Sequence, residues 1–331
     1  MKLGLIILAG GQSSRMGRDK STLPWHGREL LTDLLCRSAA FPFSERLLAS
    51  NRPYDLKKLP VPLRQTVRIV SDNFPGCGPL GGFEAAFRQG RCDYYLVLSV
   101  DLPFYDFSPL ARLLDRVKEM PDCPAVIPQT PRQQPLAALY SARLYPAICE
   151  RLQQKQYRLR GLYENQAAVY LDETRDAVLY TNINTPADYQ RALGRDLNQQ
   201  RRRPMLTLCA PHSGAGKTTA AIFLSRRFTA LGYRVAYVKS THHTQLEPKA
   251  GADTERVKKA GAFSAVLCGP EQLQPGQSKK EGLLALAQAQ DADLVLVESR
   301  AHGPAPCLDV TAFTDSEALW QEACFLTALS P

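Results

Sequence analysis

The strongest constraint on the fold lies in the first twenty residues, where an apolar run ends abruptly in a glycine-rich loop. Residues 5–9 read Leu-Ile-Ile-Leu-Ala, and Gly10 and Gly11 follow directly. An apolar run without alternation is typical of a strand buried in a parallel sheet. Glycines after such a strand let the backbone turn and bring its N–H groups close to phosphate oxygens. We therefore predict an α/β fold that begins with a phosphate-binding loop.

Positive charge follows this loop within ten residues. Arg15 and Lys20 would supply the charge that a triphosphate needs. The glycine spacing matches neither the Walker A loop nor the GxGxxG fingerprint of dinucleotide-binding proteins. The stretch therefore indicates a phosphate site without assigning it to either of those two folds.

Length and composition favour a globular enzyme with two domains. The chain has 331 residues, of which 44% are hydrophobic and 22% charged. Its net charge of +9 could indicate nucleic acid, but the aromatic residues are not interleaved with basic runs. The densest basic run, residues 201–203, falls in a polar segment. We therefore expect anionic small molecules as ligands and no nucleic acid.

Cysteine usage and hydropathy indicate the cytoplasm. The nine cysteines form no CxxC pair, so neither a zinc site nor a redox motif is predicted. The apolar N-terminal run continues straight into the glycine loop, which does not resemble a signal peptide. No stretch approaches the ~18–20 apolar residues of a membrane span. We expect a cytoplasmic protein without membrane contact.

Three further predicted strands in the first half each end at a polar residue. These residues are Asn51, Asp72 and Asp101. Strands that alternate with helices imply a mostly parallel sheet, and ligands bind beyond the carboxyl ends of such strands. Asn51 and Asp72 could instead cap turns, as Asn and Asp commonly do after a strand. Asp101 follows a fully apolar strand and places a carboxylate where a phosphate-bound Mg²⁺ needs one.

Residues 8–20, Leu-Ala-Gly-Gly-Gln-Ser-Ser-Arg-Met-Gly-Arg-Asp-Lys, resemble the signature of the molybdenum cofactor guanylyltransferases, the MobA family. The glycine loop alone would also fit sugar-nucleotide pyrophosphorylases. Gly10 stands where related cytidylyltransferases usually carry alanine. In this position the chain resembles the members of the family that use a guanine nucleotide. The resemblance spans about residues 1–195, and its later landmarks follow in order: Asn51, Asp72, Gly78-Pro-Leu-Gly-Gly82, Val100-Asp-Leu-Pro103 and Asn182-Ile-Asn-Thr-Pro186.

The resemblance implies a reaction and a set of roles. The phosphate of molybdopterin would attack the α-phosphorus of GTP and release pyrophosphate. Catalysis would rest on Arg15, Lys20 and Asp101, with Asp101 as a ligand of Mg²⁺ and Arg15 facing the leaving pyrophosphate. The GTP-binding residues implied are Leu8, Ala9, Gly10, Lys20, Asn51, Asp72 and Asp101.

Residues for molybdopterin are implied in the same way. Residues 134–139 resemble the segment that faces the pterin, although Gln133 and Gln134 stand where the family usually has a histidine. Arg158, with Arg160 beside it, resembles a basic loop for the pterin phosphate, and a solvated helix end explains these arginines equally well. Asn182 and Asn184 are further candidates, and they also precede an ordinary helix start at Thr185-Pro186.

The pattern restarts after a polar, basic stretch that we predict to be a linker. Residues 205–210 form a predicted strand, and residues 211–219 read Pro-His-Ser-Gly-Ala-Gly-Lys-Thr-Thr before a predicted helix. This context indicates a P-loop, in which Lys217 reaches the β- and γ-phosphates and Thr218 binds Mg²⁺. Pro211 replaces the first glycine and removes one N–H donor. The predicted loop residues are Gly214, Gly216, Lys217 and Thr218.

Residues 205–300 resemble the MobB family, the P-loop partner of the guanylyltransferase. Glu298 ends an apolar strand where a Walker B acid would lie. Ser240 replaces a histidine and Ser299 replaces a glycine of that family, which favours weak or absent GTP hydrolysis. His242 and His243 could suggest a metal, but paired histidines are more often part of a polar loop.

We therefore predict two α/β domains, each with a mostly parallel sheet and flanking helices. Residues 1–194 form a Rossmann-like guanylyltransferase domain, 195–204 a linker, and 205–331 a P-loop NTPase-like adapter that binds GTP. The adapter is expected to support the reaction or to dock to molybdoenzymes or their chaperones. The alternatives are a cytidylyl- or sugar-phosphate nucleotidyltransferase and a non-catalytic nucleotide-binding docking protein.

Overall fold

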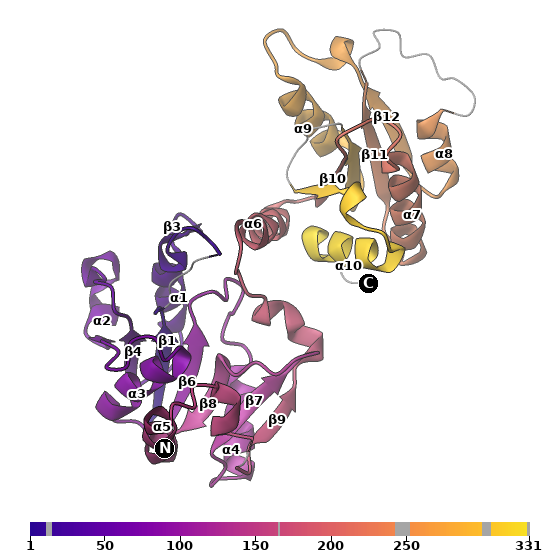
Figure 1. Cartoon of the computed structure of the whole chain (residues 1–331). Coiled ribbons are helices and arrows are strands. Elements are labelled where there is room, and N and C mark those ends of the chain that lie inside the picture. Colours follow the sequence, from indigo (N-terminus) through magenta and orange to yellow (C-terminus); the bar gives the residue numbers. More distant parts are fainter. Residues whose placement is uncertain (11–14, 165, 242–251, 300–305, 330–331) are drawn as a thin grey trace. The chain divides into compact units, whose positions relative to one another are not determined.

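The structure is a computed structural model, and it describes residues 1–10, 15–164, 166–241, 252–299 and 306–329. The chain divides into two compact units, Met1–Asp188 and Tyr189–Pro331 (Figure 1). In the part that the structure describes, no helix is long and apolar enough to cross a membrane. Each unit is described by itself below.

The first unit is built on a sheet of seven strands with the order β5-β4-β1-β6-β8-β7-β9. Only β8 runs against its neighbours, so the sheet is mostly parallel, as predicted. The strand bounds are β1 Leu3–Leu8, β4 Glu45–Ala49, β5 Val67–Val70, β6 Tyr94–Ser99, β7 Ala125–Gln129, β8 Ala137–Ser141 and β9 Val169–Asp172.

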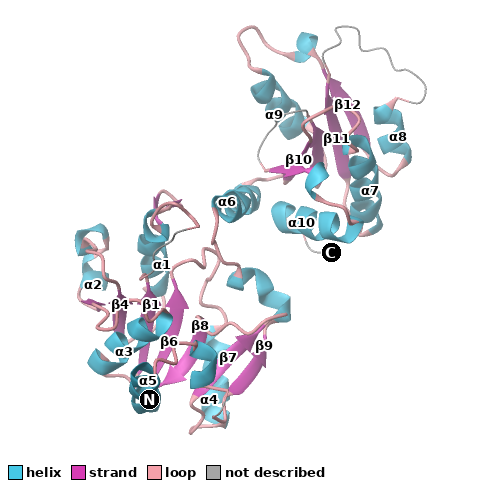
Figure 2. Ribbon diagram, viewed as in Figure 1, coloured by secondary structure: helices cyan, strands magenta, loops and turns pink. Residues whose placement is uncertain are grey.

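Helices cover both faces of this sheet (Figure 2). On one face α1 (Leu30–Ser38) and α4 (Leu110–Glu119) share a hydrophobic core with Leu5 and Ile7 of β1. On the other face α3 (Pro79–Gln89) and α5 (Tyr145–Gln153) share a second core with Ile6 and Leu8. Both sets of β1 side chains are buried, which explains why this strand is apolar throughout. A short helix, α2 (Val61–Arg64), and a two-stranded hairpin of β2 (Pro24–Trp25) and β3 (Arg28–Glu29) lie outside the sheet.

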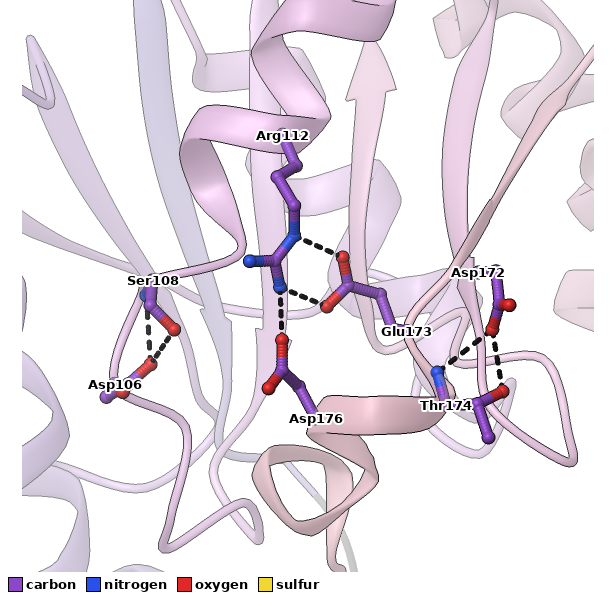
Figure 3. A network of polar contacts seen from close by, with 7 residues as sticks. All are labelled: Asp106, Ser108, Arg112, Asp172, Glu173, Thr174 and Asp176. Carbon is purple, nitrogen blue, oxygen red and sulfur yellow. Dashed lines mark hydrogen bonds and ion pairs between the residues drawn. The ribbon is translucent and has the colours of Figure 1, made fainter.

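A polar network joins α4 to the segment that follows the edge strand β9 (Figure 3). Arg112 of α4 donates from Nε to Oε1 of Glu173 at 2.7 Å, and its Nη2 contacts both Glu173 and Asp176. The Glu173 side chain is 1% exposed, whereas that of Asp176 is 44% exposed. The network therefore satisfies a buried carboxylate and ties the edge of the sheet to its covering helix.

The second unit contains a five-stranded sheet with the order β12-β11-β13-β10-β14, and all its strands are parallel. Helices α7 (Lys217–Ala230), α8 (Asp253–Lys259) and α10 (Ser316–Thr327) contribute to the core on one face, and α9 (Lys279–Ala289) covers the other. The strand bounds are β10 Met205–Cys209, β11 Val235–Ser240, β12 Ser264–Cys268, β13 Leu294–Glu298 and β14 Cys307–Asp309.

The predicted linker is largely helical in the structure. Helix α6 runs from Pro186 to Gln200, so it includes the first six residues of the segment 195–204. Asn198 donates from Nδ2 to the carbonyls of Met205 and Leu326 and accepts from the Met205 N–H. A Cβ on Gly194 would lie 2.6 Å from Pro306 Cβ. The first half of α6 buries Tyr189 and Ala192, but its second half buries Gly194 and Asn198, so residues 194–200 show no apolar period.

Candidate functional site

A pocket of about 640 Å³ opens at the carboxyl ends of β1, β4 and β5. Parallel strands end at the same edge of a sheet, so loops far apart in the sequence meet there. The first turn of α3 closes one side of the pocket through Pro79 and Gly82. Five of the predicted GTP-binding residues line this pocket: Leu8, Ala9, Gly10, Asn51 and Asp72.

Asn51 and Asp72 are joined directly, from the ends of neighbouring strands. The side-chain oxygen of Asn51 accepts from the Asp72 N–H at 2.8 Å, and Asp72 Oδ1 accepts from the Phe74 N–H at 2.7 Å. Burial raises the pKa of Asp72, and the charge of Glu84 acts in the same direction. A carboxylate held in this way offers an acceptor to the N–H groups of a ligand in the pocket.

Residues 78–82 form the start of helix α3. Gly78 has φ +65° and precedes α3, whose first residue is Pro79. A Cβ on Gly81 would lie 2.4 Å from Asp72 Oδ1, and a Cβ on Gly82 would lie 2.9 Å from Leu8 Cδ2. These two glycines therefore allow the close approach of α3 to β1 and to Asp72.

A second group of polar residues lies at the end of β6. Lys20 donates from Nζ to Asp101 Oδ2 at 2.9 Å and to Asn184 Oδ1 at 2.8 Å. The Ile183 N–H donates to the Asp101 carbonyl at 2.9 Å, which brings the segment 182–184 beside β6. Three predicted site residues from distant parts of the sequence are thus in contact. Asn184 was predicted for molybdopterin, and in the structure its side chain positions Lys20.

The Asp101 carboxylate keeps one buried oxygen without a hydrogen-bond partner, Oδ1. An unpartnered carboxylate oxygen beside a phosphate site fits a ligand of Mg²⁺, which binds through one or two carboxylates and substrate phosphates. Within the described residues no group of three or more His, Cys, Asp and Glu side chains could hold a metal. The donor set therefore fits an ion that is shared with a phosphate, rather than a protein-only metal cage.

Asp19 and Arg52, which were not among the predicted site residues, connect the pocket to the turn that carries Lys20. Asp19 caps the 3₁₀ turn Lys20–Thr22 by accepting from the Ser21 N–H, and it forms an ion pair with Arg52, which lines the pocket. Burial opposes the charge of Asp19, but the bonds from Ser21 and Arg52 lower its pKa overall. Asp19 directly precedes Lys20 and Arg52 directly follows Asn51, but nothing local in the sequence pairs Asp19 with Arg52.

Arg15 is exposed and lies between the undescribed residues 11–14 and the buried Met16. The structure gives no contact for its side chain with the predicted site. Its role toward pyrophosphate remains a prediction. Gly10 lines the pocket, and among the residues that the structure describes a Cβ there would come within 4 Å of the Ala49 carbonyl alone, at 4.0 Å.

The predicted molybdopterin segment lies at the same edge of the sheet. The Ser99 N–H at the end of β6 donates to the Leu136 carbonyl at 2.9 Å. Gln134 is held by its own loop, since its Nε2 donates to Thr130 Oγ1 at 2.9 Å. Asn182 donates from Nδ2 to the Tyr180 carbonyl at 3.2 Å and is otherwise exposed.

Arg158 precedes the 3₁₀ turn Leu159–Leu162 and is exposed. Its neighbour Tyr157 contacts Cys77 through a side-chain hydrogen bond that raises the tyrosine pKa. Cys77 lies between Gly76 and Gly78, which both line the pocket. Arg158 therefore belongs to a loop at the pocket rim, whereas Arg160 forms an ion pair with Glu164.

In the second unit the segment 211–219 contains the loop after β10 and the first three residues of α7. Gly214 and Gly216 have φ values of +80° and +87°, which side-chain-bearing residues rarely adopt. Lys217 is the first residue of α7, so the helix starts three residues earlier than predicted, and its Nζ donates to the His212 carbonyl at 2.9 Å. Thr218 donates from Oγ1 to Glu298 Oε2 at 2.9 Å. His242 and His243 lie outside the described residues.

The fold and the pocket of the first unit define a nucleotidyltransferase, followed by a domain with a P-loop. Residues 5–169 match the MobA-like NTP transferase domain, and residues 205–327 match the family described as molybdopterin guanine dinucleotide synthesis protein B. The chain belongs to the molybdenum cofactor guanylyltransferase family and carries a MobB domain after it.

Curated relatives align with the first unit over nearly their whole length. The probable molybdenum cofactor guanylyltransferase of Bacillus subtilis is 30% identical over 193 residues, which is 57% of this chain and 94% of that protein. The molybdenum cofactor guanylyltransferase of Vibrio cholerae is 30% identical over 185 residues, which is 55% of this chain and 87% of that protein. The probable enzyme of Synechococcus elongatus is 32% identical over 194 residues, 57% of this chain and 97% of that protein.

Proposed function

We propose that the first domain transfers the guanylyl group of GTP to the phosphate of molybdopterin, with or without bound molybdenum, and that the second domain binds GTP. The observation that carries the catalytic proposal is the Lys20–Asp101 ion pair, whose carboxylate keeps an unpartnered buried oxygen. Val100, directly before Asp101, donates its N–H to the carbonyl of Leu8, which lines the nucleotide-sized pocket. The named activity of the relatives supports the same reaction.

The pocket supplies the binding and orientation of the nucleotide. The backbone N–H of Gly10 and the ammonium group of Lys20 would hold the phosphates, whereas the Ala9 N–H donates to the Ala49 carbonyl at 2.9 Å. Leu8 and Ala9 would line the nucleotide site through the strand end, and Asn51 and Asp72 would lie near the base and ribose. A phosphate oxygen of molybdopterin then attacks the α-phosphorus, the bond to the β-phosphate oxygen breaks, and pyrophosphate leaves with that oxygen. Such a transfer depends on positioning and on charge neutralisation and needs no nucleophilic side chain.

Mg²⁺ is the cofactor that this chemistry calls for, and Asp101 is the residue that would hold it. When bound, the ion would draw negative charge from the phosphate oxygens. Lys20 neutralises charge at the same point, and Asn184 keeps its ammonium group in place. Arg15 would face the departing pyrophosphate, while Arg158 and Asn182 would contact molybdopterin. Docking to molybdoenzymes or their chaperones is part of the proposal for the second domain.

The test is pyrophosphate release by the full chain in the presence of Mg²⁺, GTP and molybdopterin. We expect turnover that falls at least about 100-fold in Asp101→Asn, because this change removes the metal-binding oxygen and keeps the shape of the side chain. Absence of pyrophosphate release by the folded wild-type chain would overturn the enzymatic proposal. Turnover with CTP instead of GTP would favour a cytidylyltransferase, and nucleotide binding without turnover would favour a docking protein.

A further inference from the structure

Lys239 is the second-to-last residue of strand β11, and its side chain is held between two carboxylates of the second unit. Its Nζ lies 3.2 Å from Glu298 Oε1 and also forms an ion pair with Asp253, the first residue of α8. Lysine side chains are ordinarily protonated at neutral pH. The two ion pairs therefore hold a cation beside Glu298, which in turn accepts from Thr218 of the phosphate loop.

The residues that would bind Mg²⁺ in a P-loop site are already engaged with one another. Such a site uses the hydroxyl after the loop lysine and an acid at the end of a nearby strand, here Thr218 and Glu298. Glu298 Oε2 accepts from the hydroxyls of Thr218 at 2.9 Å and Tyr237 at 2.5 Å. Its other oxygen faces the ammonium group of Lys239.

This arrangement does not fit an ordinary Mg²⁺ site. Both oxygens of Glu298 are occupied, and the side chain is only 7% exposed. A dication placed against Thr218 and Glu298 would have to displace Lys239, because Glu298 Oε1 already faces its ammonium group. A side-chain cation thus already occupies the carboxylate that Mg²⁺ would use.

We propose that Lys239 replaces Mg²⁺ in the second domain, so that the loop 211–219 binds a nucleoside di- or triphosphate without a divalent cation. The inference rests on nucleotide binding by this loop, which is part of the proposed function. Lys217 and Lys239 then neutralise the phosphates together. Because no metal is held at Thr218, the domain binds nucleotide as an adapter rather than as a metal-dependent hydrolase.

The test measures binding of N-methylanthraniloyl-GTP to the full chain by fluorescence, with Mg²⁺ or with excess EDTA. Lys20→Ala is present throughout to weaken the first site, and the signal lost on adding Lys217→Ala is assigned to the second. We expect EDTA to change the Kd of the second site by less than about threefold. We expect Lys239→Met to weaken binding in EDTA at least about tenfold, whereas Lys239→Arg keeps it.

Two results would overturn the inference while leaving nucleotide binding intact. One is a loss of binding of about tenfold or more when EDTA is added to the chain with Lys239 unchanged. The other is a folded Lys239→Met chain that binds as tightly in EDTA as the unchanged one. Lys259→Met, at an exposed lysine of α8, is the control for charge removal. A signal that Lys217→Ala does not reduce would instead overturn nucleotide binding by the loop itself, and the inference with it.

If Lys239→Met does not fold, as judged by thermal unfolding, the EDTA comparison on the chain with Lys239 unchanged still decides the question. Its two outcomes are opposite, since a Mg²⁺-dependent site loses affinity and the proposed site does not. Lys239→Arg supplies the second measurement, because it keeps the positive charge near Glu298.

Discussion

Lys20 Nζ lies 2.9 Å from Asp101 Oδ2, although 81 positions separate the two residues in the sequence. Their side chains are 15% and 13% exposed, so the pair is largely shielded from water. Asn184 accepts a second hydrogen bond from the same ammonium group. The cation is thus oriented before any nucleotide arrives, which is the condition for electrostatic stabilisation without reorganisation.

Asn184→Ala removes one of the hydrogen bonds that orient Lys20. A hydrogen bond to a charged group contributes about 1.5–3 kcal/mol, so we expect kcat/KM for GTP to fall about 10- to 100-fold. Asn182→Ala is the matched change two residues away, and we expect it to raise the KM for molybdopterin while the KM for GTP stays within about twofold. Steady-state pyrophosphate release with each substrate varied would measure both. Equal effects of the two changes on GTP would contradict the assigned roles.

Gly81→Ala and Gly10→Ala test the pocket walls. The added Cβ at position 81 would lie 2.4 Å from Asp72 Oδ1, whereas at position 10 the nearest atom of the described residues is 4.0 Å away. We expect Gly81→Ala to cost about 1–3 kcal/mol of unfolding free energy and to weaken GTP binding. We expect Gly10→Ala to change stability by less than about 0.5 kcal/mol and to reduce the preference for GTP over CTP.

Urea unfolding and nucleotide competition would measure these effects. A Gly10→Ala chain with unchanged preference would show that this glycine does not select the base. A Gly81→Ala chain with native stability would show that Asp72 moves without cost.

Asp19→Asn tests the connection between the Lys20 turn and Arg52 through its pH dependence. The folded-state pKa of Asp19 is lowered, so the carboxylate adds stability above its ordinary pKa of about 3.9 and loses it as the pH falls through the lower folded value. We therefore expect Asp19→Asn to be less stable than wild type at pH 7, and the difference to shrink below about pH 4.

The buried Trp25, on the strand that follows the Lys20 turn, reports this unfolding by fluorescence. Trp320→Phe in both chains removes the second tryptophan, which lies in the other unit. A stability difference that stays constant between pH 7 and pH 3 would mean that the charge of Asp19 is not the cause.

Glu173→Gln and Asp176→Asn compare a buried and an exposed partner of the same arginine (Figure 3). Glu173→Gln keeps the shape but leaves Arg112 without its buried carboxylate. We expect a loss of about 1–3 kcal/mol, which is less than for a fully buried pair because Arg112 is partly exposed. Asp176→Asn is expected to cost less than about 0.5 kcal/mol. Chemical denaturation measures both, and a larger effect at Asp176 would contradict the assignment.

Much of the fold could be predicted from local pattern. The apolar runs at β1, β6 and β13 are nearly continuous because both faces of each sheet are covered, and the alternation with helices indicates parallel sheets. The start of α6 agrees with the helix start expected at Thr185-Pro186, but its continuation into residues 195–200 escaped prediction, because Gly194 and Asn198 are buried there in place of large apolar residues.

The candidate site could be predicted only in part. Asn51, Asp72 and Asp101 follow strands, so sequence reading places them at the same sheet edge, and Asn51 and Asp72 line the pocket. The Asp19–Arg52 ion pair and the contact of Lys239 with Glu298 had no signal of this kind. Each depends on which loop lies beside which strand end.

By itself, the sequence determined two parallel α/β domains, each with a phosphate loop after its first strand, because strand burial and glycine placement are local properties of the chain. The tertiary structure alone decided that Asn184 holds Lys20, that Asp101 keeps a free oxygen, and that Lys239 faces the P-loop acid. These are side-chain contacts across large sequence separations, and they follow from strand order and close packing, which no local pattern encodes.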